Sequence, residues 1–414
     1  MKAKLSNFVA LDVGSSKIAG IAAYIDKKGE IKILSQNLHY SEGIKSGSIT
    51  DLKAAENSIA GAIYGLEKEC DKNIKQVAIS LSGVDTKSYY INQKIKLSGT
   101  QVISKQDIKR LIQKALSGFK IKDQEIIHYF PIEFVIDAHN IVDDPLGMYG
   151  KELSCQLHII SAASALLINL TNCFAKCQIE ITEIVLSIHA SGLSCLSEDE
   201  KNIGTFIIDI GSRTTAFGIF LSGKLIYTGC VPIGSAHITS DIAKVFSVSI
   251  IAAEKLKVLY GSVNSSSFDR DAVISMDDID PENPYSGNIA ITSITLAEVI
   301  EPRVEEIFML IKEQYDKIVI DHIMARRLVI TGGGSALRGI KELASKIFEK
   351  QVRLGKPVIV PGFAEGYNPG MYSTAIGMVQ NHAIKQHKSS FELSAIEANE
   401  HWLKKTIAWI KENI

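Results

Sequence analysis

The feature that most restricts the fold of this chain is a short pattern that occurs twice. Residues 8–24 read FVALDVGSSKIAGIAAY, and residues 206–220 read FIIDIGSRTTAFGIF. In each copy an apolar run ends at an aspartate (Asp12 or Asp209), passes through a turn with Gly and Ser, and resumes. The pattern predicts two β-hairpins whose tips carry a carboxylate and a glycine. A hairpin that only has to turn needs no such carboxylate, so the repeat indicates that both tips face one ligand.

Length and charge narrow the class of protein. The 414 residues exceed what one core usually fills, which predicts two or more domains. A formal net charge of −1 gives no field that would draw the chain onto nucleic acid, so we expect no nucleic-acid partner. Six scattered cysteines without a CxxC pair are typical of reduced core thiols. No stretch reaches the roughly 18 apolar residues that a membrane-spanning helix needs.

The elements expected after each hairpin occur in the same order. The first hairpin is followed by a strand at 31–40, a helix at 52–70 and a strand at 76–83. The second is followed by a strand at 224–234 and a helix that begins near His237. A unit of three strands and a helix that is used twice predicts a duplicated α/β architecture.

Two other segments are expected as insertions into these units. Residues 85–160 hold strand-like runs around one helix at about 105–116, which predicts an α+β subdomain. The second insertion starts with a helix at 249–263 and continues through a polar segment. A long helix at about 296–316 then returns the chain to the core, and Pro302 is expected to bend it or open its later part.

The motifs together favour a phosphate ligand. Residues 327–348 predict a strand, a glycine turn and a helix, with amides that would face a ligand. One strand-end aspartate is as readily a turn or cap residue, but the pair with this turn favours Mg²⁺ held by Asp12 and Asp209. Lys17 would offer a point charge to the phosphates. The amides expected to cradle a triphosphate belong to Gly14, Ser15, Ser16, Gly211, Ser212 and Arg213.

These residues resemble the actin, sugar-kinase and heat-shock-70 ATPase superfamily, and more closely the FtsA family of bacterial cell-division proteins. The resemblance covers essentially the whole chain and implies an α/β, actin-like ATPase fold, with two duplicated ribonuclease-H-like halves and an inserted α+β subdomain in each half. The similar segments are LDVGSSK (11–17), HYFPIEFVID (128–137), DDPLGMYGKEL (143–153), HASGLSCLSEDEKNIG (189–204), VPIGSAHITSDIA (231–243), LAEVIEPRVEEIF (296–308) and NPGMYSTAIGM (368–378).

The resemblance also implies boundaries for the domains. The expected parts are a first core (6–84, 161–203 and 368–387), its inserted subdomain (85–160), a second core (204–234 and 290–367), a small subdomain (235–289), a flexible linker (388–399) and an amphipathic membrane-targeting helix (400–414).

In this family ATP would lie between the two halves. The resemblance assigns the phosphates to Asp12–Lys17 and to Asp209–Thr215, which includes Thr214. It assigns the adenosine end to Gly332, Gly333, Gly334 and Ser335, and the ribose and base to Glu254 and Lys257. Without the resemblance, Glu254 and Lys257 would be interpreted as part of a solvated helix face.

Two departures from the family pattern bear on hydrolysis. The second loop reads GSRTT where the family often has glycines, and Ser235 follows Gly234 where a second glycine is common. Arg213 would either contact a phosphate or narrow the loop and slow turnover. We therefore expect ATP binding with at most slow ATPase activity, and no catalytic residue is assigned.

The last residues, EHWLKKTIAWIKENI, predict an amphipathic helix. Tryptophans beside lysines are typical of a helix at a membrane interface, and the resemblance implies the same anionic membrane surface as its target. The alternative is a helix that docks on its own domain. The residues expected at the membrane are Trp402, Leu403, Lys404, Lys405, Ile407, Trp409, Ile410 and Ile414.

The resemblance further implies protein partners. The C-terminal peptide of FtsZ would bind the second small subdomain, around 249–308, with Arg303 as a contact unless Arg303 is an ordinary surface charge. The implied function is a division protein at the cytoplasmic face of the bacterial inner membrane that polymerises into filaments, tethers the FtsZ ring and recruits later division proteins. The alternatives are a small-molecule kinase, for which we find no catalytic base, and a pilus-assembly or cell-shape relative of actin.

Overall fold

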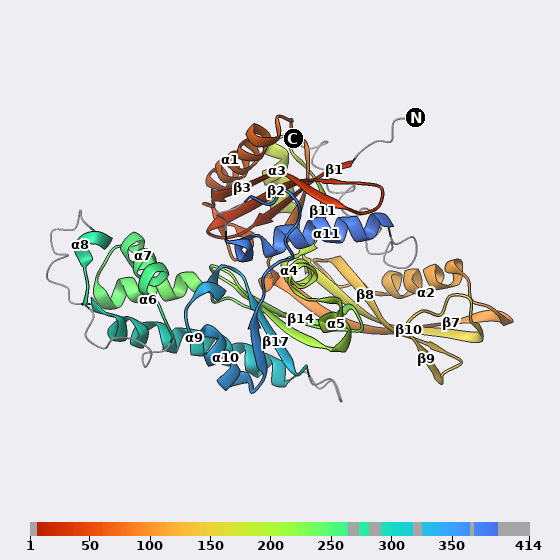
Figure 1. The fold of residues 1–414 in the computed structure, drawn as a ribbon. Helices are drawn as coiled ribbons and strands as arrows, with labels where there is room; N and C mark the ends of the chain where they lie inside the picture. Colours follow the sequence, from red (N-terminus) through yellow and green to blue (C-terminus); the bar gives the residue numbers. More distant parts are fainter. Residues whose placement is uncertain (1–5, 264–272, 281–290, 318–324, 365–367, 388–414) are drawn as a thin grey trace.

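Two five-stranded sheets with the same strand order form the two halves of the body. In Figure 1 the upper half holds the sheet β11-β6-β1-β2-β3, and the lower half holds the sheet β14-β13-β12-β17-β18. The structure is a computed structural model that describes residues 6–263, 273–280, 291–317, 325–364 and 368–387.

The two sheets match strand for strand. The first contains β1 (Ser6–Val13), β2 (Lys17–Ile25), β3 (Ile31–Tyr40), β6 (Gln76–Leu81) and β11 (Glu180–Leu186). The second contains β12 (Thr205–Ile210), β13 (Thr215–Leu221), β14 (Lys224–Val231), β17 (Arg327–Thr331) and β18 (Gln351–Leu354). Each begins with three antiparallel strands, and its first strand also pairs in parallel with the fourth. The predicted duplication of an α/β unit is therefore confirmed.

Helices cover both faces of the first sheet. Apolar residues of α1 (Leu52–Cys70) and α3 (Ser164–Lys176) share one core with β1 and β6, while α4 (Ser187–Cys195) and α11 (Ser373–His387) pack on the other face. Helix α1 coincides with the predicted range 52–70, and its N-cap Asp51 accepts a hydrogen bond from the Ala54 amide. A small hairpin precedes it, β4 (Ile44–Lys45) and β5 (Ser48–Ile49).

Helix α4 joins the two halves. It packs on α11 in the first half and on the strands of the second half, where α5 (Glu198–Ile203) lies beside it. On the opposite face of the second sheet, α9 (Ser293–Asp316) and α10 (Ile340–Phe348) bury their apolar residues against β12 and β13. A ligand that contacts both halves would therefore stabilise the arrangement in which α4 and α11 hold the halves together.

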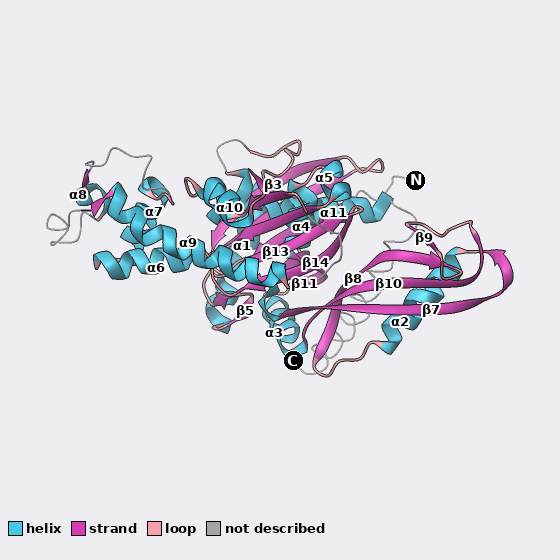
Figure 2. Ribbon diagram, turned by 90° about the horizontal axis from the view of Figure 1, so that it is seen from below, coloured by secondary structure: helices cyan, strands magenta, loops and turns pink. Residues whose placement is uncertain are grey.

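The inserted subdomain of the first half projects from one end of the body (Figures 1 and 2). Its sheet has the order β7-β10-β8-β9, built from β7 (Thr86–Val102), β8 (Gln124–Ile136), β9 (Asn140–Val142) and β10 (Tyr149–Ala163). Helix α2 (Lys105–Gly118) packs on this sheet through a core that includes Ile95, Leu111 and Leu153. The three strand-like runs and the helix follow the sequence prediction, and β9 was not predicted.

The insertion of the second half lies at the opposite end (Figure 1). It contains α6 (Ser235–Phe246), α7 (Ile250–Tyr260), β15 (Val273–Ile274), α8 (Met276–Ile279), β16 (Ile291–Thr292) and the first part of α9. Helix α9 continues through Pro302 to Asp316, so the proline does not end it. Residues such as Ile300 and Val304 on either side of Pro302 are buried and hold the helix against its neighbours.

Candidate functional site

The two hairpin tips have the same backbone geometry. The Gly14 amide donates to the Lys17 carbonyl at 3.1 Å, and the Gly211 amide donates to the Thr214 carbonyl at 2.9 Å. A Cβ atom on Gly14 would lie 2.7 Å from that Lys17 oxygen, and one on Gly211 would lie 2.8 Å from the Thr214 oxygen. Both positions are therefore restricted to glycine, and the repeated sequence is a repeated turn.

Other amides of the tips are available to an anion. In the parts of the chain that the structure describes, the amides of Ser15, Ser16, Ser212 and Arg213 donate to no acceptor. The amides of both tip glycines are used inside the turns, so each tip offers two amides rather than the three expected from the sequence. The first tip is also held from the side, because the Ser46 amide donates to the Ser15 hydroxyl at 2.8 Å. Successive unpaired N–H groups in a turn form an anion-binding nest.

Asp12, at the end of β1, is held by the neighbouring strand. The Ser80 hydroxyl on β6 donates to Asp12 Oδ1 at 2.6 Å and accepts from the Val13 amide at 2.9 Å. Burial raises the pKa of Asp12, while the Ser80 bond and the charge of Lys17 oppose that rise. A carboxylate whose charge is costly in isolation gains from a nearby cation.

Asp209 is held in the same way from the other half. The Ser191 hydroxyl on α4 donates to Asp209 Oδ2 at 2.5 Å and lies 3.0 Å from the Thr374 hydroxyl on α11. Burial raises the pKa of Asp209 to about 6; the Ser191 bond opposes this, and the negative charge of Asp12 adds to it. The two carboxylates thus influence each other across the junction of the halves.

Lys17 connects the first tip to the second half. Its ammonium lies beside Gly333, where a Cβ atom would be 3.4 Å from Nζ. Burial lowers the pKa of Lys17, and the charges of Asp12, Glu254 and Asp209 oppose this shift. Lys17 occupies the position that Thr214 has in the second tip, where the basic residue is instead Arg213, one position earlier.

The glycine turn after β17 packs directly on the end of β12. Gly332 has a φ of 86°, and a Cβ there would lie 2.3 Å from Asp209 Oδ1. A Cβ on Gly334 would lie 2.3 Å from Ile210 Cγ2. The Ser335 hydroxyl donates to the Gly332 carbonyl at 2.7 Å and so stabilises the turn itself. The glycines let the backbone approach the carboxylate more closely than any side chain would allow.

Glu254 and Lys257 lie on α7, against the first turn of α6. Lys257 Nζ donates to Glu254 Oε2 at 2.6 Å, to the Thr239 hydroxyl at 2.8 Å and to the Ser235 carbonyl at 3.2 Å. The amide of Ser235 in turn donates to the Gly211 carbonyl of the second tip at 2.9 Å. The pair is therefore behind the second tip, linked to it through the N-terminus of α6.

Packing explains the glycine before α6. A Cβ atom on Gly234 would lie 2.6 Å from the Gly211 carbonyl oxygen and 2.7 Å from the Ser212 carbonyl oxygen. Helix α6 can start against the second tip only because Gly234 has no side chain. Ser235, the departure from the family pattern, fits because its amide supplies a hydrogen bond to the tip.

The assembled site has the chemistry of a polyphosphate and divalent-cation site. It combines two amide nests, one half-buried ammonium group and two carboxylates, one from each half. Sequence reasoning missed the hydroxyls of Ser80, Ser191 and Thr374. The strand pairing of β6 with β1 is what brings Ser80 to Asp12, and that pairing is not visible in the sequence.

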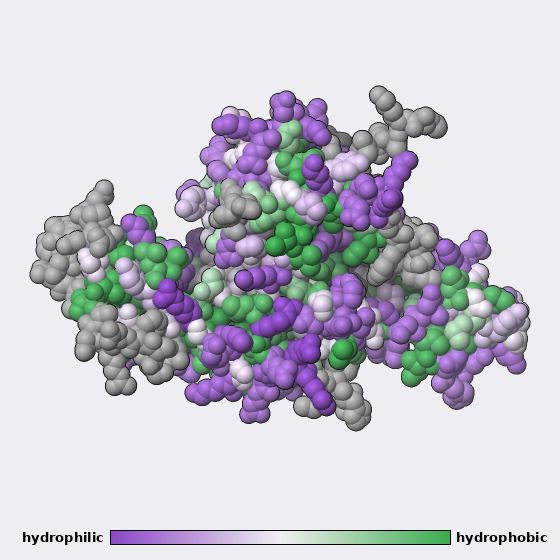
Figure 3. Space-filling model, viewed as in Figure 1, coloured by the Kyte–Doolittle hydropathy of each residue, from purple (hydrophilic) through white to green (hydrophobic). Residues whose placement is uncertain are grey.

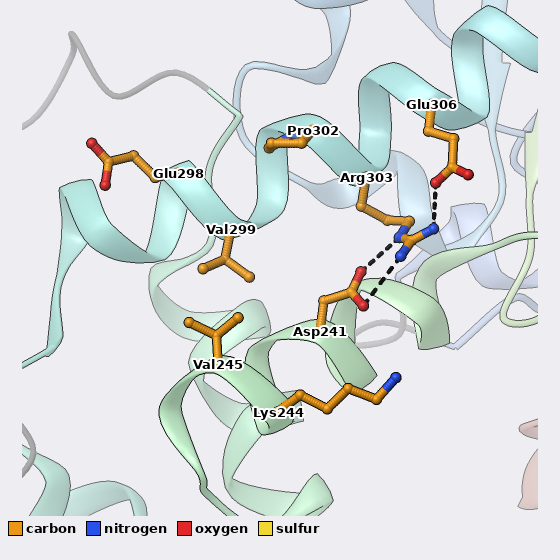
Figure 4. Close-up of a pocket in the computed structure, with 8 residues that line it drawn as sticks. All are labelled: Asp241, Lys244, Val245, Glu298, Val299, Pro302, Arg303 and Glu306. Carbon is orange, nitrogen blue, oxygen red and sulfur yellow. Dashed lines mark hydrogen bonds and ion pairs between the residues drawn. The ribbon is translucent and has the colours of Figure 1, made fainter.

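A second candidate site is a groove between α6 and α9 (Figure 4). Arg303 points into it, with Nε 2.6 Å from Asp241 Oδ2 and the guanidinium also paired with Glu306. Val245 and Val299 face each other across its apolar part, and 61% of Val245 is exposed. The groove has a volume of about 370 Å³ and is lined by Asp241, Lys244, Val245, Glu298, Val299, Pro302, Arg303 and Glu306.

The expected membrane-targeting helix at 400–414 lies outside the described residues, as does the linker at 388–399. Among the helices that the structure does describe, each is too short or too polar to span a bilayer.

Comparison with known proteins identifies relatives of this chain. The family model described as "Cell division protein FtsA" matches residues 206–377, and the model described as "SHS2 domain inserted in FTSA" matches residues 83–161. The second match coincides with the inserted subdomain.

The similarity extends over whole proteins. The FtsA of Rhizobium meliloti is 30% identical over 390 residues, 92% of this chain and 88% of that protein. The FtsA of Pseudomonas aeruginosa is 28% identical over 411 residues, which cover 98% of this chain and 97% of the relative. The FtsA of Escherichia coli K12 is 26% identical, with coverage of 98% and 97%.

Solved structures share the fold at low sequence identity. A PilM-PilN type IV pilus biogenesis complex matches with a TM-score of 0.64 at 13% identity, over 91% of this chain and 98% of that one. MreB5 of Spiroplasma citri bound to ADP matches with a TM-score of 0.56 at 14% identity, over 92% and 99%. The actin-like fold expected from the sequence is thereby confirmed.

Proposed function

This chain belongs to the FtsA family of cell division proteins, and from that premise we propose that it binds Mg²⁺-ATP between its two halves and uses the bound state to organise the FtsZ ring at the membrane. The observation that carries the proposal is the pair of matching tips, each with an aspartate, a glycine-closed turn and available amides, whose two carboxylates influence each other across the junction of the halves.

The residues present fit the nucleotide and its metal ion. The tips at 14–17 and 211–214 would hold the phosphates through their free amides, with Lys17 as the counter-charge. Asp12 and Asp209 would hold the hydrated Mg²⁺, which withdraws charge from the phosphates when bound. Burial, together with the charge of Asp12, raises the pKa of Asp209, and a metal ion held by both carboxylates would offset both effects. The adenosine end would lie toward the turn at 332–335, with α7 behind it.

Binding would be coupled to the angle between the halves. Asp12 belongs to the first half and Asp209 to the second, so a ligand held by both stabilises the closed arrangement through differential binding. The halves meet where α4 crosses α11, and Gly377 permits this crossing because a Cβ there would lie 1.8 Å from the Ala190 carbonyl oxygen. Closure would thereby alter the surfaces that touch neighbouring copies in a filament.

The partner surfaces complete the proposal. The groove around Arg303 would take the C-terminal peptide of FtsZ, and the helix at 400–414 would lie on the cytoplasmic face of the inner membrane. One such helix binds reversibly, so assembly into filaments would multiply its residence time. Filaments on the membrane would then tether the FtsZ ring and gather later division proteins, with ATP hydrolysis slow at most.

Two other functions were expected as alternatives. A small-molecule kinase needs a base near the accepted hydroxyl. At the described site Asp12 and Asp209 accept hydrogen bonds from Ser80 and Ser191, and Glu254 is paired with Lys257. A pilus-assembly or cell-shape role is supported only by structures of 13 to 14% identity, which show the fold alone. The sequence relatives over the whole chain are division proteins.

Titration with a fluorescent ATP analogue tests the proposal. We expect binding that depends on Mg²⁺ and falls by at least about tenfold in Asp12→Asn, since a carboxylate ligand of the cation is lost. Asp199→Asn, an exposed carboxylate on α5, serves as the matched control and should bind as wild type does. Binding that ignores both Mg²⁺ and Asp12 would exclude the proposed site.

A further inference from the structure

The inserted subdomain carries a concentrated positive charge that the nucleotide site does not use. Residues 86–122 contain nine basic residues and one acidic residue, Asp107, in a chain whose net charge is −1. All nine basic side chains are exposed. They are Lys87, Lys94, Lys96, Lys105, Lys109, Arg110, Lys114, Lys120 and Lys122.

The fold places these charges around one edge of the inserted sheet. Strand β7 forms an edge of the inserted sheet, and α2 packs beside it. Arg110 Nη2 on α2 donates to the Lys96 carbonyl of β7 at 3.2 Å, and Lys114 Nζ donates to the Lys94 carbonyl at 3.1 Å. Two basic side chains of the helix thus reach the edge strand that carries two more. We call the exposed surface of β7, α2 and residues 119–122 the basic face.

Acidic residues gather on the other strands of the same sheet. Residues 124–163, which form β8, β9 and β10, contain six acidic residues and one lysine, Lys151. The subdomain is therefore polarised across its sheet, with β7 and α2 positive. A charge separation of this kind orients a protein at a charged surface, because one face is attracted and the other repelled.

Exposed apolar side chains border the basic face at the far end of β7. Val102 and Tyr149 are partners across β7 and β10, with 45% and 69% of their surface exposed. Leu146 is 37% exposed, and the loop that holds it is joined to Ile103 through the Gly147 amide. In Figure 3 this end of the molecule shows hydrophobic residues among hydrophilic ones. Lysines beside a tyrosine and aliphatic groups match a lipid headgroup region.

The position at which α11 ends brings this face within reach of the proposed membrane helix. Helix α11 ends on the side of the body that carries the inserted subdomain (Figure 1). The linker at 388–399 can span at most about 40 Å when fully extended. With residues 400–414 on a membrane, the end of α11 stays within that distance of the lipid, and electrostatic attraction acts over about 10 Å. The charge distribution then decides which face of the body turns toward the lipid.

We propose that the basic face is a second membrane contact, which binds anionic lipid headgroups and fixes the orientation of the body on the membrane. This proposal rests on the membrane placement of residues 400–414 proposed above. The two contacts differ in kind: the terminal helix inserts an apolar stripe, whereas the basic face adds salt-sensitive electrostatic attraction.

The test is co-sedimentation of the full chain with phosphatidylcholine vesicles that contain or lack phosphatidylglycerol. The face variant carries Lys96→Gln, Lys105→Gln, Lys109→Gln and Lys120→Gln, all exposed positions. The matched control removes the same charge from the first half, with Lys27→Gln, Lys28→Gln, Lys32→Gln and Lys68→Gln. The tail variant carries Ile407→Glu and Ile410→Glu.

We expect the face variant to bind phosphatidylglycerol vesicles about tenfold more weakly at about 0.1 M salt, and the control to stay within about twofold of wild type. The tail variant should keep a weak, salt-sensitive binding that disappears when the face substitutions are added. If the face variant binds as tightly as the control, the proposal is overturned, and an acidic protein is left as the partner of this face.

The outcomes separate the two contacts. A tail variant that binds as wild type does contradicts the proposed role of residues 400–414, whatever the face variant does. Should the face variant lose its melting transition, the tail variant alone decides: loss of its residual binding between about 0.05 and 0.3 M salt supports the basic face, and absence of residual binding at low salt contradicts it.

Discussion

Asp209, a proposed ligand of Mg²⁺, differs in its electrostatic environment from a carboxylate that is paired within the fold. Burial raises its pKa to about 6, which means that the folded protein without a ligand disfavours its charge. Glu200 is the contrasting carboxylate: the Arg353 guanidinium, with Nε 2.7 Å from Oε1, lowers the pKa of Glu200. Arg353 already stabilises the charge of Glu200, whereas the proposed metal ion would stabilise the charge of Asp209.

Removing each charge should therefore have opposite effects on stability. Asp209→Asn relieves the buried charge but weakens the Ser191 bond, so we expect a net gain on the order of 1 kcal/mol, or roughly one to two degrees in melting temperature near pH 7.5. Glu200→Gln breaks an ion pair that is buried on the Glu200 side and solvent-screened on the Arg353 side, and should cost about 1–3 kcal/mol. Differential scanning calorimetry measures both.

Addition of Mg²⁺-ATP provides the second comparison. Glu200→Gln should still be stabilised by the ligand, whereas Asp209→Asn should lose most of that stabilisation. An Asp209→Asn protein that is less stable than wild type without ligand, and that Mg²⁺-ATP still stabilises fully, would contradict the assignment of Asp209 as a ligand of the cation.

Three buried histidines make stability depend on pH. His128, His158 and His189 lie where the inserted sheet meets α4 and the second sheet, and the His189 Nδ1 atom has no hydrogen-bond partner among the described residues. Burial lowers the pKa of His158 to about 4 and of His189 to about 3, and the charge of Lys385 lowers the latter further. Their contribution to stability is thus complete above about pH 6.5 and is lost as the pH falls toward these values.

His189→Gln should flatten this dependence. Each histidine that is neutral when folded and protonated when unfolded contributes a slope of up to about 1.4 kcal/mol per pH unit below pH 6.5. Urea unfolding of wild type and His189→Gln between pH 7 and pH 5 measures the difference. Parallel pH profiles for the two proteins would show that His189 is not buried in its neutral form.

Helices and strands with a clear period of apolar residues can be predicted from the sequence, whereas elements without such a period cannot. Strand β3 and helix α1 coincide with the expected ranges because apolar residues alternate in one and recur every three to four positions in the other. Helix α4 was not predicted, because nearly all of its nine residues are buried and no polar face marks its period. Because α4 was not predicted, Ser191, whose hydroxyl donates a hydrogen bond to Asp209, was not predicted as part of the site.

The residues of the candidate site likewise fall into those that local sequence predicts and those that only the tertiary structure brings together. Both aspartates, both tip glycines and the turn at 332–335 could be predicted, because each lies next to a strand whose sequence is distinctive. Ser80 and Thr374 could not, since their contacts depend on strand order and on the packing of α11. Local sequence predicts the tip, and tertiary structure supplies the groups that orient it.

The groove between α6 and α9 can be tested with the C-terminal peptide of FtsZ. Arg303→Gln removes one of the charged donors of the groove, beside Lys244, and should weaken peptide binding by about tenfold. Lys312→Gln, on the same helix and paired with Asp316 outside the groove, should leave binding unchanged. Fluorescence anisotropy of a labelled peptide measures both, and equal affinities for the two variants would place the peptide elsewhere.

For the whole molecule, the crossing of α4 and α11 sets how the halves are joined. Gly377→Ala would force a Cβ atom into the Ala190 carbonyl, 1.8 Å away, so the helices must separate. We expect a loss of about 2–4 kcal/mol in the free energy of unfolding. Gly118→Ala, at the end of α2 with nothing within 4 Å, is the control and should be neutral or slightly stabilising. A Gly377→Ala protein as stable as the control would contradict the observed crossing.

We propose that the two duplicated tips hold one metal-bound nucleotide between the halves. Crystals grown with a non-hydrolysable ATP analogue and Mn²⁺ in place of Mg²⁺ test it most directly, because the anomalous signal locates the cation. We expect one anomalous peak beside the phosphates, faced by Asp12 and Asp209. The phosphates should lie against the amides at 15–16 and 212–213. A nucleotide bound outside the junction, or a cation faced by neither carboxylate, would contradict it.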